Sequence, residues 1–221
     1  MPRTARAAIG GCVYHVLNRG NNRQRIFRKP ADFAAFVQLL IDGKQHADVD
    51  LLAYCLMNNH FHLALIPRRD RDLAAYLSWV TNTHVKRYRA HYPDTSGHLY
   101  QGRYKSFVVE EDSHLLSLLR YIEANPLRAK LVDRAQDWRW SSLGCDDKIS
   151  KALLSDWPID RPRNWPALVN RNMKREELTQ IRASIMRDRP LGKIDWVMKM
   201  AKRMRMEHTL RSRGRPRKKT S

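Results

Sequence analysis

The feature that most constrains the fold is a pair of apolar segments joined by two asparagines. The segments "LLAYCLM" (residues 51–57) and "HFHLALI" (residues 60–66) read as strands, and Asn58-Asn59 between them is typical of a two-residue hairpin turn. Side chains at positions i and i+2 of a strand share a face, so His60 and His62 should project together. Two imidazoles on one face are either solvated or core histidines, or ligands of one metal ion. The hairpin alone leaves both interpretations open.

The remaining elements alternate around this hairpin. Apolar periodicity predicts helices at residues 31–47 and 70–92, and a third helix from residue 113 that Pro126 should end near Asn125. Further strands are predicted at residues 12–18, 98–100 and 104–110. The order β-α-β-β-α-β-β-α indicates an α+β fold, a ferredoxin-like antiparallel sheet with helices on one face.

Composition divides the chain into four parts. Residues 1–144 hold the predicted sheet and helices, whereas residues 145–172 contain three prolines and little periodicity, which favours a linker. Residues 173–208 indicate a basic helical extension, broken into two helices at "DRPLG". Residues 209–221, "TLRSRGRPRKKTS", indicate a flexible basic tail.

Charge is the strongest bulk signal. The formal net charge is +20, and residues 171–221 hold 17 Lys and Arg against 5 Asp and Glu. Such an excess favours a polyanionic partner: DNA, RNA or an anionic membrane surface. No apolar run approaches the ~18 residues of a membrane span. The three cysteines are far apart and form no CxxC pair, which favours a reduced, cytoplasmic protein.

The third predicted helix carries a second candidate pair. Tyr121 and Asn125 stand four residues apart and share a helical face, which docking on the sheet could bring over His60 and His62. A tyrosine hydroxyl has a pKa near ~10 and is a poor nucleophile unless it is activated. A cation that polarises a phosphate would make attack by Tyr121 plausible. A packing role for Tyr121, and a helix-capping role for Asn125 before Pro126, remain open, and the rival tyrosines are Tyr88, Tyr100 and Tyr104.

Five blocks in order make the chain similar to a known family. The blocks "YHVLNRGNNRQRIF", "AYCLMNNHFHLALIP", "GHLYQGRYKSFVVEED", "LLRYIEANPLRAKLV" and "WRWSS" resemble the REP-associated tyrosine transposases, His-hydrophobic-His (HUH) single-tyrosine nucleases related to insertion-sequence transposases. The resemblance covers roughly residues 9–143 and becomes looser after them. It implies that residues 1–144 form the nuclease domain, with His60, His62 and Asn125 as metal ligands and Tyr121 as nucleophile.

The resemblance also implies a reaction and its partners. The implied reaction is metal-dependent cleavage and rejoining of single-stranded DNA beside a REP-type hairpin, through a 5′-phosphotyrosine and a free 3′-OH. Mg²⁺ or Mn²⁺ is the implied metal, the location is the cytoplasm in association with the nucleoid, and the protein is a monomer or a homodimer. Asn58 stands where the family more often has Pro, which suggests an altered turn but unchanged chemistry.

Basic and amide side chains beside these blocks are the expected DNA contacts. Loop residues can hold phosphates and read exposed bases, and mixtures of Arg, Lys and Tyr suit base stacking. Arg128 could equally be a structural cap, and "RGRP" is either an AT-hook core or part of a generic basic tail. The expected contacts are Arg19, Asn21, Asn22, Arg23, Arg25, Arg103, Lys105, Arg120, Arg128, Arg213 and Arg215.

Two other functions are compatible with this fold. A non-cleaving or weakly cleaving DNA-binding regulator needs the basic surface, and a sequence-tolerant RNA-binding module needs an open sheet. Neither needs the set formed by His60, His62, Tyr121 and Asn125, so this set favours the nuclease.

Overall fold

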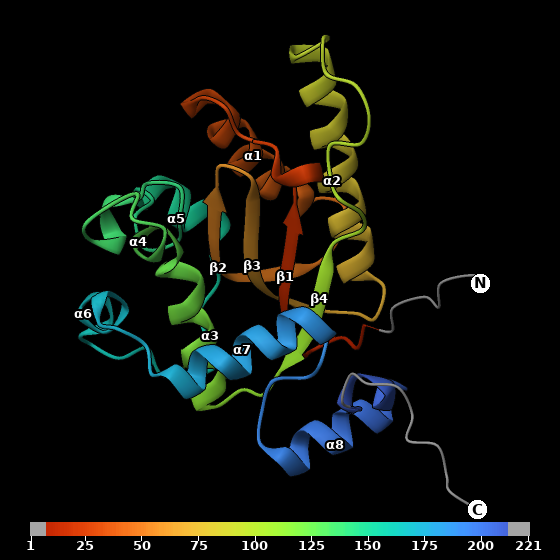
Figure 1. Cartoon of the computed structure of the whole chain (residues 1–221), viewed down its shortest axis with the longest axis vertical. Coiled ribbons are helices and arrows are strands. Elements are labelled where there is room, and N and C mark those ends of the chain that lie inside the picture. Colours follow the sequence, from red (N-terminus) through yellow and green to blue (C-terminus); the bar gives the residue numbers. More distant parts are fainter. Residues whose placement is uncertain (1–7, 212–221) are drawn as a thin grey trace, which may run out of the picture.

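The computed structural model describes residues 8–211 and confirms the α+β fold. Its four-stranded sheet has the order β2-β3-β1-β4, and each neighbouring pair is antiparallel (Figure 1). The strands are β1 (Val13–Arg19), β2 (Val49–Met57), β3 (His60–Pro67) and β4 (Lys105–Val109).

The hairpin of the histidine strand forms as predicted. Met57 pairs with His60 across the two-residue turn, and β3 lies between β2 and β1 at the centre of the sheet. A central strand with helices on both faces is apolar on both sides, which explains the almost continuous apolar run around the two histidines.

Helices cover both faces of the sheet. The long helices α1 (Pro30–Gly43) and α2 (Asp72–His91) pack together on one face, over inward side chains such as Val16 and Leu63. The helix α3 (Ser113–Glu123) packs on the opposite face, over β2 and β3, and Figure 1 shows it in front of the sheet. The helix that carries Tyr121 therefore lies on the face to which His62 points.

One predicted strand differs from the structure, and the predicted end of the third helix near Asn125 is confirmed. The strand expected at residues 98–100 is a loop, in which Tyr100 forms a single antiparallel bridge to Gly20, because the segment pairs only with the residues at the end of β1. The third helix ends at Glu123, and Asn125 begins a separate one-turn helix, α4 (Asn125–Arg128), because Pro126 has no N–H to continue the ladder.

The expected linker, residues 145–172, is instead packed on the core. It contains α5 (Asp147–Leu153) and α6 (Trp165–Asn170), and Leu153 and Trp165 are buried. A short helix, η2 (Ala135–Asp137), precedes this region. The burial of large apolar side chains stabilises a segment whose prolines and lack of periodicity indicated a linker.

The C-terminal region covers one edge of the sheet. The two predicted helices are present as α7 (Arg175–Arg187) and α8 (Ile194–Arg203), followed by η3 (Glu207–Leu210). Between them Leu191 donates its N–H to the Val108 carbonyl, and its own carbonyl accepts from Glu110 N–H. The chain thus pairs with the free edge of β4, and α7 crosses β4 and α3 (Figure 1). Across the described residues, no helix is both long and apolar enough to cross a bilayer.

Candidate active site

The structure brings together the histidine pair and Tyr121. The rings of His60 and His62 lie 5.0 Å apart between centroids, at 83° to each other. The Tyr121 ring lies edge-on to His62 at 5.9 Å and 87°. Residues from a central strand and from a helix more than fifty positions later therefore share one site.

Neighbouring groups determine which ring nitrogen of His60 is protonated. Its Nδ1 lies 2.7 Å from the Oδ1 of Asn59, while the Nδ2 of Asn59 donates to the Arg23 carbonyl at 3.1 Å. An amide oxygen can only accept, so the Nδ1 of His60 must carry the proton. The Nε2 lone pair of His60 is left as the coordinating atom.

His15 is the corresponding neighbour of His62, and the sequence did not single it out. The Nε2 of His15 lies 2.9 Å from the Nδ1 of His62, and the two rings stack at 5.1 Å and 26°. If His15 accepts this hydrogen bond, His62 is also protonated at Nδ1 and its Nε2 is left for a ligand. The alternation in "CVYHVLN" places His15 on a face with Val13 and Leu17, but only the register of β1 against β3 brings it beside His62.

Burial keeps these histidines neutral. It lowers the pKa of His15 to about 3, and together with the nearby charge of Arg19 it lowers the pKa of His60 to about 4. Burial lowers the pKa of His62 well below its ordinary value of 6.5, with smaller contributions from the neighbouring histidines and from Arg128 and Arg19. Neutral imidazoles are the form that binds metal ions, so the donor set fits a divalent cation.

Asn125 and Arg128 secure the end of the tyrosine helix. The Nδ2 of Asn125 donates to the carbonyls of Tyr121 and Ile122 at 3.2 and 3.3 Å, which replaces bonds lost at Pro126. Arg128 donates to the Tyr121 carbonyl at 2.7 Å and to the Oδ1 of Asn125 at 2.9 Å. Its guanidinium also lies 4.1 Å from the Tyr121 ring centroid. Both residues therefore act as caps here, although an amide oxygen has a second lone pair for another ligand.

Arg19 adds a second positive charge to the site. It pairs across the strands with His60, and its buried Nε has no hydrogen-bond partner among the described residues. A buried guanidinium nitrogen without a partner is costly unless an anion or water satisfies it. With Arg19, Arg128 and neutral imidazoles, the site suits a phosphate group.

The other expected DNA contacts divide into two groups. Asn21, Asn22, Arg23, Arg25 and Arg103 lie at or near the surface, in the loops that follow β1 and precede β4. The other two also have intramolecular partners. The Nζ of Lys105 donates to the Ile185 carbonyl, and the Arg120 guanidinium donates to the carbonyls of Arg171 and Asn172, so both hold the C-terminal region against the core.

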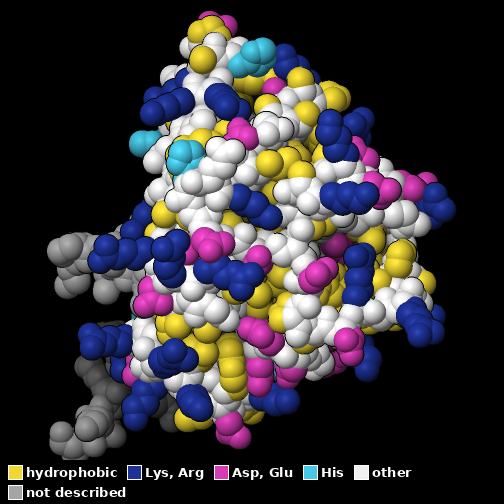
Figure 2. Space-filling model, turned by 180° about the vertical axis from the view of Figure 1, so that it is seen from behind, with side chains coloured by type: hydrophobic (Ala, Val, Ile, Leu, Met, Phe, Trp, Pro, Cys, Tyr) yellow, Lys and Arg dark blue, Asp and Glu magenta, His cyan; other side chains and the backbone are white. Residues whose placement is uncertain are grey.

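The last two expected DNA contacts lie in the basic tail, and the wider surface shows how basic side chains are distributed. Arg213 and Arg215 lie outside the described residues. Figure 2, the view from behind Figure 1, shows Lys and Arg scattered over the whole side, with Asp and Glu among them. On this side the basic charge is therefore not gathered in one patch.

The rival tyrosines lie on the other side of the sheet. Tyr88 is buried on α2 and donates to the Arg25 carbonyl, while the hydroxyl of Tyr100 lies 2.6 Å from the Nδ1 of His84. Tyr104 packs against the apolar cluster under α1 and α2. Of the four candidate tyrosines, Tyr121 is the one with a ring contact to His62 among the described residues.

A second group of potential metal ligands has a structural role. Glu110, Asp112 and His114 meet at the start of α3. Asp112 caps this helix and lies 3.2 Å from the Nζ of Lys193, and Glu110 accepts from the Lys193 N–H at 2.7 Å. These carboxylates therefore hold the segment before α8 against α3.

Comparison with known proteins agrees with this geometry. The profile of the family described as "Transposase IS200 like" matches residues 8–125, which include both histidines, Tyr121 and Asn125. A curated protein of Haemophilus influenzae, named as a candidate REP-associated tyrosine transposase, is 23% identical over 124 residues, which are 51% of this chain and 69% of that protein.

A solved structure supports the fold. A REP-associated tyrosine transposase bound to a REP hairpin aligns with a TM-score of 0.54 and 18% identity, over 72% of this chain and 93% of that one. Because the family profile matches more than half of the sequence, the chain belongs to the IS200-like transposases and is a DNA transposase by family.

Proposed function

We propose that this transposase cleaves and rejoins single-stranded DNA beside a REP-type hairpin, with Tyr121 as the nucleophile. The observation that carries the proposal is the edge-on contact of Tyr121 with His62, whose ring lies 5.0 Å from that of His60. The hairpin-bound structure to which the chain is similar, and the named relative, support the choice of substrate.

The proposed step is a transesterification. The Tyr121 hydroxyl loses its proton to water and its oxygen attacks the phosphorus, so a phosphotyrosine bond forms while the bond to the 3′-oxygen breaks. The leaving 3′-oxygen takes up a proton and becomes a free 3′-OH. The exchange conserves one phosphodiester bond, so an attacking 3′-OH can reverse it and release Tyr121 without an energy source.

The chain's own residues bind and orient the phosphate. Arg19, beside His60, offers an Nε that has no hydrogen-bond partner among the described residues, and the Arg128 guanidinium lies over the Tyr121 ring. His60 and His62, with Asn125 as third ligand, would hold Mg²⁺ or Mn²⁺, which when bound supplies charge neutralisation at the phosphate. His60, His62 and Asn125 are neutral ligands, so the negative charge that balances the cation would come from the phosphate.

One observation favours a second candidate function. The Oδ1 of Asn125 already accepts a hydrogen bond from the positively charged Arg128, which weakens it as a metal ligand. A DNA-binding regulator that cleaves weakly or not at all would tolerate this arrangement. Cleavage itself decides between the two candidates.

The test is the formation of a covalent adduct. The full chain is incubated with a single-stranded hairpin from near its own gene, with Mn²⁺ or with EDTA, and run on a denaturing gel. The proposal expects a Mn²⁺-dependent adduct that Tyr121→Phe abolishes and the matched control Tyr104→Phe keeps, with hairpin binding unchanged in Tyr121→Phe. An adduct of undiminished yield in EDTA, or one that persists in Tyr121→Phe, would refute it.

A further inference from the structure

A pocket lies on the face of the sheet opposite the histidine pair. It encloses about 460 Å³ between the outer side of α2, the loop of residues 98–104 and the end of β1. We propose that this α2 pocket binds one unpaired base of the single-stranded DNA beside the hairpin. This inference rests on the proposed function and adds a specificity site to it.

The lining of the α2 pocket matches the chemistry of a nucleotide. It combines amides, hydroxyls and two arginines, and no carboxylate lines it. Amides offer a donor and an acceptor to base edges, and Arg can bind phosphate or stack on a base. The residues that carry this chemistry are Asn18, Asn21, Asn82, Gln101, Arg89 and Arg103.

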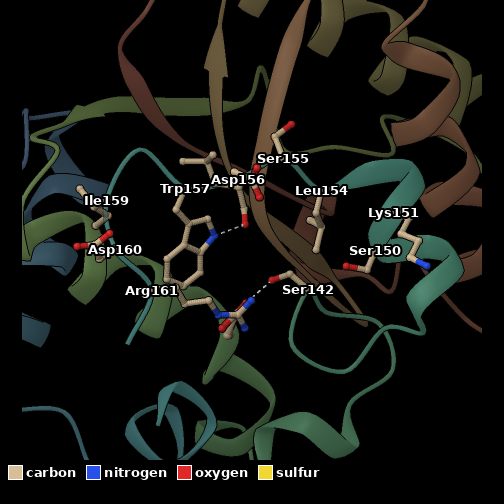
Figure 3. A pocket seen from close by; sticks show the side chains of 12 residues that line it. Ser142, Ser150, Lys151, Leu154, Ser155, Asp156, Trp157, Ile159, Asp160 and Arg161 are labelled. Carbon is tan, nitrogen blue, oxygen red and sulfur yellow. Dashed lines mark hydrogen bonds between the residues drawn. The ribbon is translucent and has the colours of Figure 1, made fainter. Parts of the chain in front are cut away.

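Another large pocket differs from the α2 pocket in the charge of its lining. It encloses about 450 Å³ beside β2. Figure 3 shows Trp157 donating a hydrogen bond to the Leu52 carbonyl and Ser142 donating one to the Glu123 carboxylate. Three carboxylates line it, those of Glu123, Asp156 and Asp160. Lys151 and Arg161 line it too, so carboxylates and basic groups are mixed there, and a polyanion meets like charges that the α2 pocket does not have.

The walls of the α2 pocket are held in place by hydrogen bonds. Asn21 N–H donates to the Leu99 carbonyl at 2.8 Å, and Gln101 N–H donates to the Arg19 carbonyl at 2.9 Å. The Nε2 of Gln24 lies 3.1 Å from the carbonyls of His98 and Leu99. These bonds tie the loop to the end of β1, so the pocket exists before any ligand binds.

The end of β1 connects the pocket to the candidate active site. Asn18 lines the pocket, while the next residue, Arg19, pairs with His60. Because successive strand residues point to opposite faces, these neighbours serve the two sites from opposite sides of one strand. A DNA strand held at Tyr121 can therefore pass over the loop with Arg23 and Arg25 and place a nearby base in the pocket.

The experiment removes one base at a time. Binding of the full chain to a labelled hairpin with an unpaired flank is compared with binding to copies that carry one abasic site at each flank position. We expect one position where base removal weakens binding roughly tenfold, as loss of a bound base does. Asn82→Ala and the pocket-filling Asn82→Trp should weaken binding to the intact hairpin and erase this penalty.

Asn82 is exposed on α2, and the matched control Gln38→Ala removes an exposed amide from α1 and should keep the full penalty. The absence of a sensitive position, or an undiminished penalty in both Asn82 variants, would overturn the pocket proposal even if the tyrosine adduct forms. If one flank position is sensitive to base removal and the Asn82 variants erase that sensitivity, but no adduct forms, the result would count against the proposed function alone. At saturating DNA, Asn82→Ala should still form the adduct.

Discussion

His15 shows how a single residue can prepare the site. It lies in the core, is almost inaccessible to solvent at 1% exposure, and its Nε2 lies 2.9 Å from the Nδ1 of His62, which leaves the Nε2 of His62 free of this contact. The sequence could predict the histidine pair because a strand fixes the i and i+2 relation. It could not predict the partner from β1, because a helix separates the two strands and their register depends on the whole sheet.

The first prediction concerns this positioning role. His15→Leu removes the acceptor, so the affinity for Mn²⁺ should fall by about 10- to 100-fold, whereas His15→Gln retains an acceptor and should recover much of it. Nitrogen-15 NMR of the metal-free protein should show that His15→Leu loses the Nδ1–H form of His62. Unchanged Mn²⁺ affinity together with an unchanged His62 tautomer would contradict the role.

At the scale of elements, the junction between α3 and α4 decides how Tyr121 is held. The sequence predicted the helix and its end near Asn125 from one apolar stripe and from Pro126. It left open whether Asn125 binds metal or caps the helix, and in the structure the side chain caps it. Lys105 and Arg120 remain expected DNA contacts, but the sequence did not predict their intramolecular partners, which lie in the C-terminal region more than fifty residues away.

The second prediction separates the two roles of Asn125. Asn125→Ala removes the cap bonds, so the free energy of unfolding should fall by about 1 kcal/mol in urea titrations. If Asn125 is also a ligand, the Mn²⁺ affinity and the adduct yield should fall too. A loss of stability with normal Mn²⁺ affinity would show that Asn125 is only a cap.

The third prediction concerns the packing of α2 against the loop of residues 98–104. Burial lowers the pKa of His84, which contacts Tyr100, to about 4. The unfolded chain binds a proton at its ordinary pKa of about 6.5, so His84 favours folding above that pH and loses this contribution as the pH falls towards 4.

This contribution should fall by up to about 1.4 kcal/mol per pH unit within that window. Urea unfolding between pH 7 and 4.5 should therefore show a shallower loss of stability in His84→Gln than in the wild type. The surface variant His46→Gln controls for the loss of a histidine. An identical pH slope in His84→Gln and the wild type would mean that this histidine does not resist protonation.

At the scale of the whole molecule, the C-terminal third closes the sheet that carries the site. The N–H of Ser155 donates to the Leu51 carbonyl at the edge of β2, and Leu191 pairs with the edge of β4. Composition predicted the excess positive charge of this region but not its packing, because the contacts depend on distant partners. Both edges of the sheet are therefore protected within one chain.

The fourth prediction tests the basic tail. Deleting residues 212–221 removes five Lys and Arg and no acid. Each phosphate contact adds about 0.9 to the slope of log affinity against log salt, so the slope should fall by roughly 2–4 units. If "RGRP" acts as an AT-hook, the affinity loss should be larger for duplex with AT-rich flanks than with GC-rich flanks. An unchanged salt slope would show that the tail does not contact DNA.

The central claim is that Tyr121 becomes covalently joined to DNA, and the most direct measurement is the mass of the joined peptide. After incubation with the single-stranded hairpin and Mn²⁺, digestion with trypsin and nuclease leaves a nucleotide on one tyrosine-containing fragment. Cleavage after Arg120 and Arg128 isolates the peptide "YIEANPLR", in which Tyr121 is the only tyrosine. The account predicts the nucleotide on this peptide. A nucleotide on the fragment with Tyr104, or on no tyrosine at all, would contradict it.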